Sequence, residues 1–592
     1  MRRQHRMAFG ASLDAQGAAF RLWAPAARRV ALHLPETRRD FTMSPIDDGW
    51  HVLRVPNLLA GTAYQYIVDD AHTVPDPASR FQPGDVDGPS ALIDPEAFDW
   101  PDTSWRGRPW HEAVIYELHV GAYTREGTFA AVEADLARLA ALGITAIELM
   151  PLADFAGKRN WGYDGVLPFA PDSRYGTPTA LKRFIAAAHG LGLMVFLDVV
   201  YNHFGPEGNY LARYAPGFFT DAQTGWGPAI NFAVRPVRDF FIENALYWIL
   251  EFNIDGLRLD AVHAIHDDSR PNILEELAAR VRLAVPADRH VHLILENDAN
   301  RARYLRRDAN DQIAAYNAQW NDDFHHAAHV ILTGESEGYY SDFAADPIAK
   351  FGRALAEGFA FQGERSAYRG APRGEASDDL PPMAFVNFLQ NHDQIGNRAF
   401  GERLTTLAEP AALEAATAIL LLSPSPPLLF MGEEWDATTP FLFFCDFAGA
   451  LGAAVRDGRR REFAKFSAFA TDKAMAAIPD PVALETFTTS QLGTHPPAAP
   501  AIRRLLDIRR QEIMPRLPGM HGGAQYTIVT TRLVVTWRLG DSSALTLVAN
   551  LGPAATAAPV RSTAGRILWG RNVNTATLPP WAVVWTLAEA GP

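Results

Sequence analysis

From Ala113 to Trp435, short apolar runs alternate with stretches that have an amphipathic helical pattern. Eight runs have the length of buried strands: residues 113–120, 146–151, 194–203, 256–262, 292–298, 315–323, 385–393 and 426–435. Buried parallel strands read as continuous apolar runs, and each needs a crossover connection, usually a helix. Eight such units predict an α/β fold of the (β/α)8 or TIM-barrel class. A doubly wound open sheet is the structural alternative, but no glycine-rich phosphate loop follows the first run.

Regions of different pattern flank this series. Residues 1–98 contain short alternating runs between Pro, Gly and Asp clusters, which predicts a β-sandwich. The predicted barrel domain covers residues 99–515, with excursions at 204–235, 336–380 and 436–500 that shape a cleft, and a helix at 501–513 that closes the barrel. Residues 516–592 are again rich in strand-like runs, and they predict a small C-terminal β domain.

Composition narrows the classes of partner. The chain has 54 Lys and Arg against 68 Asp and Glu, a net charge of −14, which argues against nucleic acid or an anionic membrane as the main partner. One cysteine, Cys445, excludes an internal disulfide framework. The basic N-terminus has no apolar run behind it, and the apolar stretch 416–431 is interrupted by prolines. We therefore expect a soluble cytoplasmic protein; its oligomeric state stays open.

Four of the eight runs end in polar groups. The third ends in Asp198 and His203, the fourth in Arg258, Asp260 and His263, the fifth in Glu296, and the seventh in His392 and Asp393. A single acid at a strand end is most simply a solvated residue or an arginine partner. Four such ends in one barrel favour a site instead, because chemistry in this fold lies at the C-terminal rim.

The spacing of these groups predicts their roles. Arg258 and Asp260 are two residues apart, so they lie on one face of a strand, and the cation is expected to keep Asp260 ionised. The apolar residues that precede Glu296 are expected to raise the pKa of its carboxyl. An ionised nucleophile and a protonated donor about 5–5.5 Å apart are what glycoside hydrolysis with retention requires.

The segments DVVYNH, GLRLDAVH, the Glu of LILEND and FLQNHD resemble, in order, the four signature regions of the α-amylase superfamily of glycoside hydrolases. The resemblance covers most of residues 113–435. It implies that Asp260 is the nucleophile, Glu296 the general acid/base, and Asp393 the stabiliser of the distorted sugar. It also implies that Arg258, His203 and His392 line the subsite of the reacting sugar, with Asp198 bracing it and His263 nearby.

A further match is the loop that contains Trp161, Tyr163 and Asp164, where superfamily members stack an aromatic ring on the reacting glucose. A turn that simply packs its Trp and Tyr is the alternative. The resemblance implies no cofactor. Asn202 stands where some amylases bind calcium, but no carboxylate cluster accompanies it in 204–235, so no metal is expected. His325 and His326 beside Asp322 and Asp323 are expected to form a capped, solvated helix start rather than a metal site.

The residues around these motifs, including LENDANR and FLQNHDQIGNRAFGERL, resemble those of the malto-oligosyltrehalose trehalohydrolases. The segment FRLWAPAARRVALHL resembles the N-terminal β-sandwich of these enzymes, which is similar to a carbohydrate-binding domain. The implied reaction cleaves the α-1,4 bond next to the terminal trehalose of maltooligosyltrehalose, releasing trehalose. Two alternatives remain open: a glycogen branching or debranching enzyme of the same superfamily, and a non-catalytic barrel that binds glycan. Trp226, Trp320, Glu337 and Tyr339 are available for recognising trehalose, and none of them is assigned.

Overall fold

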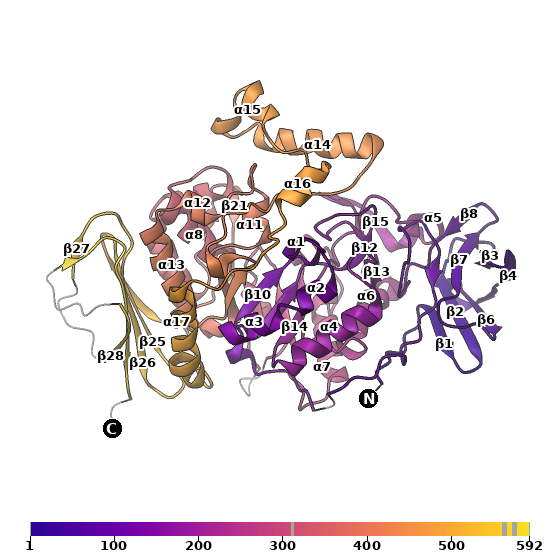
Figure 1. Cartoon of the computed structure of the whole chain (residues 1–592), viewed down its shortest axis with the longest axis horizontal. Helices are drawn as coiled ribbons and strands as arrows, with labels where there is room; N and C mark the ends of the chain where they lie inside the picture. Colours follow the sequence, from indigo (N-terminus) through magenta and orange to yellow (C-terminus); the bar gives the residue numbers. More distant parts are fainter. Residues whose placement is uncertain (1, 103, 309–312, 559–564, 571–576, 591–592) are drawn as a thin grey trace.

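The computed structural model describes residues 2–102, 104–308, 313–558, 565–570 and 577–590. Three parts follow one another along the long axis in Figure 1: an N-terminal β unit, a central barrel and a C-terminal β unit. No helix in this described portion is long and apolar enough to cross a membrane.

The central part is a closed barrel of eight parallel strands in chain order, which confirms the predicted fold class. Each strand falls within one of the eight predicted runs. The strands are β10 (Ile115–Leu118), β11 (Ala146–Leu149), β14 (Met194–Val199), β17 (Gly256–Leu259), β18 (His292–Leu295), β19 (Ala318–Trp320), β22 (Phe385–Phe388) and β23 (Pro427–Phe430). Helices α2 (Phe129–Glu133), α3 (Leu136–Leu142), α4 (Pro178–Gly190), α6 (Arg235–Leu250), α7 (Ile273–Ala284), α8 (Asp322–Thr333) and α13 (Pro410–Leu422) supply crossovers.

Strand periodicity gives the barrel interior two kinds of layer. Ile115, Phe196 and Ile294 belong to a buried apolar cluster that fills the lower interior. Two residues further along their strands, the same inward face carries Glu117, Asp198 and Glu296. The apolar layer therefore supports a layer of charged groups at the C-terminal rim.

The flanking β units also match the predicted fold class. The N-terminal unit has two sheets. The first consists of β1 (Gly10–Asp14), β2 (Gly17–Trp23), β6 (Trp50–Pro56) and β5 (Ser44–Ile46). The second consists of β4 (Arg39–Thr42), β3 (Val30–Leu34), β7 (Ala63–Val68) and β8 (His72–Val74), with β9 (Ser90–Ala91) paired to β7. The C-terminal unit has a sheet of β24 (Gln525–Val529), β25 (Arg532–Arg538), β26 (Ala544–Asn550), β30 (Val583–Ala588) and β28 (Arg566–Trp569). The helix α17 (Pro500–Ile508) packs against α13 between this unit and the barrel.

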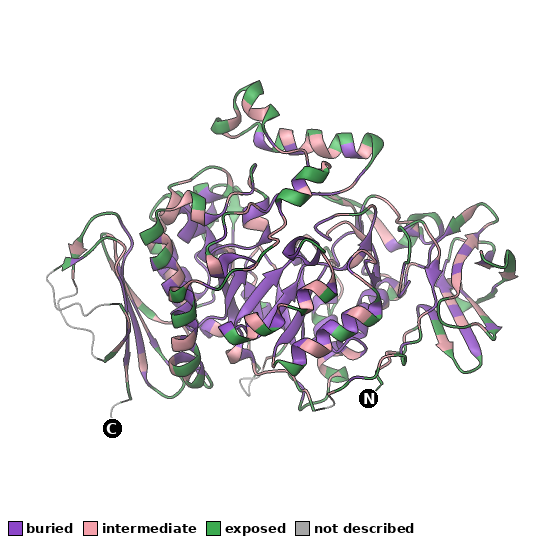
Figure 2. Ribbon diagram, viewed as in Figure 1, coloured by how far each residue is buried: buried purple, intermediate pink, exposed green. Residues whose placement is uncertain are grey.

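Three insertions extend from the rim. The first contains the hairpin β15 (Phe219–Thr224) and β16 (Gly227–Ile230). The second contains α9 (Ser341–Ala344), α10 (Pro347–Glu357) and the short hairpin β20 (Arg365–Ser366) and β21 (Ala371–Pro372). The third contains α14 (Gly449–Phe463), α15 (Asp472–Ala476) and α16 (Leu484–Thr489); α14 and α15 project from the barrel in Figure 1. Helices α14 and α15 carry many exposed residues in Figure 2, whereas the barrel strands are buried.

Candidate active site

The Arg258 guanidinium is the centre of the charged layer. Its Nη1 donates to Oδ2 of Asp198 at 2.6 Å and to Oδ1 of Asp260 at 2.8 Å, and its Nη2 donates to Oε2 of Glu296 at 2.9 Å. The side chain is fully buried and lies 4.1 Å over the ring of Trp320. One cation thus binds three carboxylates that lie at the C-terminal ends of β14, β17 and β18. The hydrogen bonds to Asp260 and Glu296 from one guanidinium hold these two groups close together.

The backbone after β17 contributes to the same arrangement. Ala261 has a positive φ of 39°, a conformation that is strained for a residue with a Cβ atom. In this conformation its N–H donates to Oε2 of Glu296 at 2.7 Å. Glu296 therefore accepts two hydrogen bonds from donors that favour its charged form.

The charge states of the pair differ from the sequence-based expectation, which was wrong for the unliganded site. Burial and the charge of Glu296 raise the pKa of Asp260 well above its usual range, despite Arg258. Burial also opposes ionisation of Glu296, but Arg258, His263 and the Ala261 N–H together lower the pKa of this carboxyl. The two groups titrate as a pair, and in the unliganded site these contacts favour the charged form of Glu296 over that of Asp260.

A second chain of hydrogen bonds joins His392 to the same cluster. Its Nδ1 lies 2.5 Å from Oε1 of Glu117, and its Nε2 lies 2.8 Å from the Tyr163 hydroxyl. The hydroxyl in turn donates to Oδ2 of Asp198 at 2.6 Å. Burial opposes protonation of His392, but the charges of Glu117 and Asp393 raise its pKa to about 9. His392 is therefore a buried cation at neutral pH.

This raised pKa predicts a pH-dependent contribution to stability. The folded protein holds the His392 proton up to about pH 9, whereas an unfolded histidine loses it near pH 6.5. The stabilisation is therefore complete below about pH 6.5 and is lost as pH rises through about 9. Glu117→Gln is expected to flatten this dependence by up to about 3 kcal/mol. Urea unfolding of both proteins at the two ends of this range measures it, and parallel pH curves would contradict it.

The loop after β11 positions Trp161, Tyr163 and Asp164. Trp161 stacks on Phe441 and donates its indole N–H to the carbonyl of Leu442 at 2.9 Å. Asp164 accepts a hydrogen bond from Nδ2 of Asn160 at 2.6 Å. Trp161 and Tyr163 face the cavity described below, whereas Asp164 does not line it.

Gly162 fixes the turn between Trp161 and Tyr163. Its φ is 104°, and a Cβ atom there would lie 2.2 Å from the carbonyl oxygen of Pro151. Gly162→Ala is therefore expected to destabilise the protein by about 1–3 kcal/mol and to lower activity by displacing the Tyr163 ring. Thermal unfolding and kcat measure the two effects. Gly217→Ala, where a Cβ would meet nothing within 4 Å, is the matched control.

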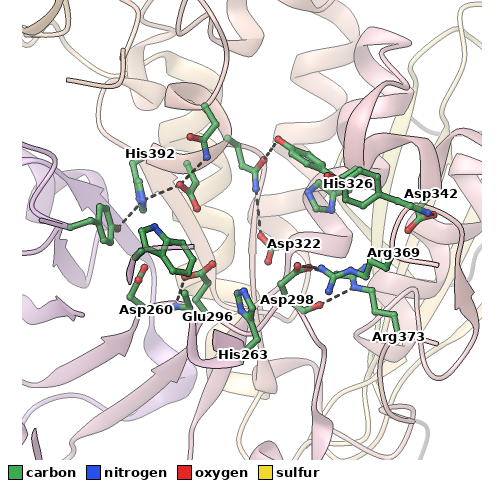
Figure 3. A pocket seen from close by; sticks show the side chains of 18 of the residues that line it. Asp260, His263, Glu296, Asp298, Asp322, His326, Asp342, Arg369, Arg373 and His392 are labelled. Atoms are coloured by element: carbon green, nitrogen blue, oxygen red, sulfur yellow. Dashed lines mark hydrogen bonds and ion pairs between the residues drawn. The ribbon is translucent and has the colours of Figure 1, made fainter. Parts of the chain in front are cut away.

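A cavity of about 460 Å³ opens above these groups, and Figure 3 shows its lining. Of the residues predicted from sequence, Asp260, Glu296, Asp393, His203, His263, His392, Trp161 and Tyr163 line it. Arg258, Asp198 and Asp164 do not. Arg258 and Asp198 are buried behind the cavity surface and act through the groups that they contact.

The mouth of the cavity includes a half-exposed tryptophan. Trp226, in the turn between β15 and β16, stacks on His203 with ring centroids 5.1 Å apart and is 52% exposed. His203 contacts the Tyr163 carbonyl and the side chain of Asn202, and burial lowers its pKa to about 4, so the ring is neutral. The exposed Trp226 ring, supported by His203, offers a flat surface of the kind on which sugars stack.

No group of three or more His, Cys, Asp or Glu residues in the described ranges has a geometry that could hold a metal ion. Asn202 instead donates to Oδ2 of Asp260 at 3.3 Å. The Asp260 carboxylate thus accepts hydrogen bonds from the Arg258 guanidinium and the Asn202 side-chain amide.

The start of α8 differs from the expectation. Asn321 caps the helix by accepting from the Phe324 N–H, but Asp323, His325 and His326 are buried, so the predicted solvated terminus was wrong. The second insertion covers it: Asp323 accepts from Nη1 of Arg373 at 2.5 Å and from the N–H groups of residues 360 and 361. Asp322 and His326 line the cavity.

Several titratable groups of the site were not predicted from the sequence. Glu117 and Glu148 both point into the barrel, and burial and the charge of Glu117 raise the pKa of Glu148. Their position two residues after Ile115 and Ala146, on the inward face of the predicted strands, was a usable signal. Asp322, whose pKa burial and Glu296 raise to about 8, gave no such signal because the covering insertion has no strand pattern.

Comparison with known proteins agrees with this geometry. The family described as alpha amylase, catalytic domain, matches residues 78–242, and carbohydrate-binding module 48 (isoamylase N-terminal domain) matches residues 8–95. A domain of unknown function, DUF3459, matches residues 521–585. The crystal structure of a candidate alpha amylase from Salmonella typhimurium superposes with a TM-score of 0.94 at 44% identity, covering 99% of this chain and 100% of that chain. Fold and comparisons place the chain among the glycoside hydrolases of the α-amylase superfamily.

Two relatives specify the family. A malto-oligosyltrehalose trehalohydrolase from Saccharolobus solfataricus is 45% identical over 462 residues, which are 77% of this chain and 80% of the relative. A protein of the same name from Deinococcus radiodurans is 41% identical over 526 residues, 87% of this chain and 84% of that relative. The chain belongs to the malto-oligosyltrehalose trehalohydrolase family.

Proposed function

We propose that this enzyme hydrolyses the α-1,4-glucosidic bond next to the terminal trehalose of maltooligosyltrehalose, with Asp260 as nucleophile and Glu296 as general acid/base. The observation that carries the proposal is the pairing of these two carboxylates on one buried guanidinium at the rim of the cavity. Family membership supports the reaction and the use of a glucan oligosaccharide.

The proposed reaction proceeds in two displacements. Oδ of ionised Asp260 attacks the anomeric carbon while Glu296 gives its proton to the departing glycosidic oxygen. Water, deprotonated by Glu296, then cleaves the glycosyl–Asp260 ester and releases the maltooligosaccharide with its α configuration retained. The scheme needs an ionised Asp260 and a protonated Glu296 in the substrate complex, whereas the contacts of the unliganded site favour the charged form of Glu296. Substrate binding therefore has to reverse this preference.

Other residues hold the reacting sugar in this proposal. Asp393, which is 37% exposed and accepts from Nδ2 of Asn397 at 3.1 Å, binds its hydroxyls. His392 and the Tyr163 ring pack beside the sugar. Arg258, itself paired with Asp198, holds the carboxylates of Asp260 and Glu296 in position. No cofactor takes part in any of these steps.

Product analysis tests the function. Incubation with maltotriosyltrehalose is expected to give trehalose and maltotriose, with the α anomer of maltotriose appearing first. New α-1,6 linkages in a glucan substrate would instead identify a branching enzyme, and binding without turnover would identify a non-catalytic barrel.

We also propose roles for the three domains and a cellular location for the enzyme. We assign catalysis to residues 99–515, with residues 1–98 and 516–592 as accessory domains, and we place the enzyme in the cytoplasm, without a nucleic-acid or membrane partner. The net charge of −14 and the single buried thiol of Cys445 support this setting.

A further inference from the structure

We propose that Glu117 is a positioning residue of the active site: it holds His392 as a cation, and this cation keeps the neighbouring Asp393 ionised for binding sugar hydroxyls. The inference rests on the role given to Asp393 in the proposed function and adds to it the residue that sets its charge. Glu117 itself is buried and does not line the cavity.

The contact between Glu117 and His392 has two points. Glu117 lies on the inward face of β10, and His392 begins the short helix α11 (His392–Gly396), 275 residues further along the chain. One carboxylate oxygen, Oε2, accepts from the His392 N–H at 3.0 Å, a first-turn amide that has no partner within its own helix. The other oxygen, Oε1, lies 2.5 Å from Nδ1 of the ring. Both side chains are 1% exposed, so water does not compete for this contact.

The hydrogen bonds around the His392 ring determine its protonation. An ionised carboxylate only accepts hydrogen bonds, so Nδ1, which faces Glu117, carries a proton. On the other side of the ring, the Tyr163 hydroxyl donates to Oδ2 of Asp198 at 2.6 Å, so its oxygen is left to accept from Nε2 at 2.8 Å. Both ring nitrogens are therefore donors, which is the arrangement of an imidazolium cation.

His392 is also the cation that faces Asp393. Its Nε2 lies 3.6 Å from Oδ1 of Asp393, and no lysine or arginine among the described residues forms an ion pair with this carboxylate. The hydrogen bond from Nδ2 of Asn397 at 3.1 Å brings no charge. Burial raises the pKa of Asp393, and the charge of His392 is the largest influence that opposes this rise. Ionisation of Asp393 therefore depends on the proton that Glu117 holds on His392.

Charged and titratable groups on other elements also act on the two residues. Around His392 they are His119, Glu148, Tyr163, Asp198 and Arg258. Around Asp393 they are Tyr163, Arg258, Asp260, Glu296, Asp322 and Tyr339. The charge of Glu117 also acts on Asp393 directly and raises its pKa, but less than the charge of His392 lowers it. Loss of the Glu117 charge, and with it the His392 proton, therefore has the net effect of raising the pKa of Asp393.

Glu117→Gln removes this charge and preserves the contacts. The amide oxygen can accept from the His392 N–H, and the NH2 group can donate to Nδ1, which leaves a neutral ring that still donates from Nε2 to Tyr163. Because Asp393 acts as an anion, a raised pKa lowers activity on the acidic side, and activity recovers as the pH rises and the carboxyl ionises.

Hydrolysis of maltosyl fluoride measures this effect, because departing fluoride needs no proton from Glu296. The ratio of kcat/KM in Glu117→Gln to that in the wild type is measured from about pH 5 to about pH 9, since kcat/KM reports groups of the free enzyme. This ratio is expected to fall about 10-fold or more on the acidic side, as for loss of an adjacent opposite charge, and to recover on the alkaline side.

Two further variants separate charge from shape. Glu117→Asp keeps the charge and shortens the side chain, so its activity ratio is expected to be the same at every pH. Glu433→Gln replaces another buried carboxyl, which does not line the cavity, and is expected to leave the ratio flat. A loss in Glu117→Gln that is equal at every pH would assign Glu117 a purely structural role, and an unchanged ratio would remove it from the site; either result overturns the inference.

Two measurements keep the test independent of folding and of the proposed function. If Glu117→Gln does not fold, His392→Gln removes the cation directly and has to show the same recovery at high pH; a loss that does not depend on pH would again overturn the inference. Maltosyl fluoride contains no trehalose. A wild type that hydrolyses it but releases no trehalose from maltotriosyltrehalose would therefore contradict the proposed function alone.

Discussion

Asp260→Asn is expected to lower kcat by about 10⁴-fold or more, because the amide cannot form the glycosyl ester. The substitution preserves shape, and Arg258 keeps its hydrogen bonds to Asp198 and Glu296, so the fold should persist. Steady-state hydrolysis of maltotriosyltrehalose measures the loss, and thermal unfolding checks the fold. Asp268→Asn, an exposed aspartate in the loop after the same strand, is the matched control.

A modest loss of activity in Asp260→Asn would contradict the nucleophile assignment. An equal loss in Asp268→Asn would show that the effect comes from general disturbance of the loop. A folded variant that still binds maltotriosyltrehalose but turns it over at the background rate is the expected result.

Glu296→Gln is expected to lower kcat by about 10²–10⁴-fold, the usual contribution of a positioned acid/base group. The glutamine keeps an oxygen acceptor for Arg258 and the Ala261 N–H, but it can neither donate a proton to the leaving sugar nor activate water. A maltosyl fluoride separates these roles, because departing fluoride needs no proton. With this substrate the first step should remain fast, and the loss should fall on the second step.

Burst kinetics distinguish the two steps. A burst of fluoride followed by slow turnover is expected for Glu296→Gln. Slow release without a burst would mean that Glu296 does not act as the acid of the first step. Asp298→Asn, which changes the other carboxylate at the same strand end and keeps an oxygen acceptor for Arg373, serves as the positional comparison. Because Glu296 is intact in this variant and can still activate water, Asp298→Asn is expected to keep a fast second step.

The barrel could be predicted from sequence because its determinants are local. Each strand is a short apolar run, and Phe129, Val132, Leu136 and Leu139 mark the first crossover helices, which end at Gly143 in a left-handed conformation. The carboxylates at the rim followed from the same pattern. Arg258 and Asp260 do share a strand face, and the guanidinium contacts the carboxylate as their spacing predicted.

The protonation of the pair could not be predicted in this way, because it depends on contacts across strands. The sequence shows Arg258 beside Asp260 but not that Arg258 also donates to Glu296, nor that Ala261 adopts a left-handed conformation and donates there too. These contacts shift the negative charge toward Glu296. The burial of the α8 start was missed for a similar reason, since the residues that cover it lie in an insertion without regular periodicity.

The proposed mechanism depends on covalent glycosylation of Asp260. Rapid quenching of Glu296→Gln during reaction with maltosyl fluoride, followed by proteolysis and mass spectrometry, detects this intermediate. We expect a maltosyl adduct on the peptide that contains Asp260, formed and lost at rates compatible with turnover. An adduct on another carboxylate, or a first product of β configuration with no adduct, would contradict it.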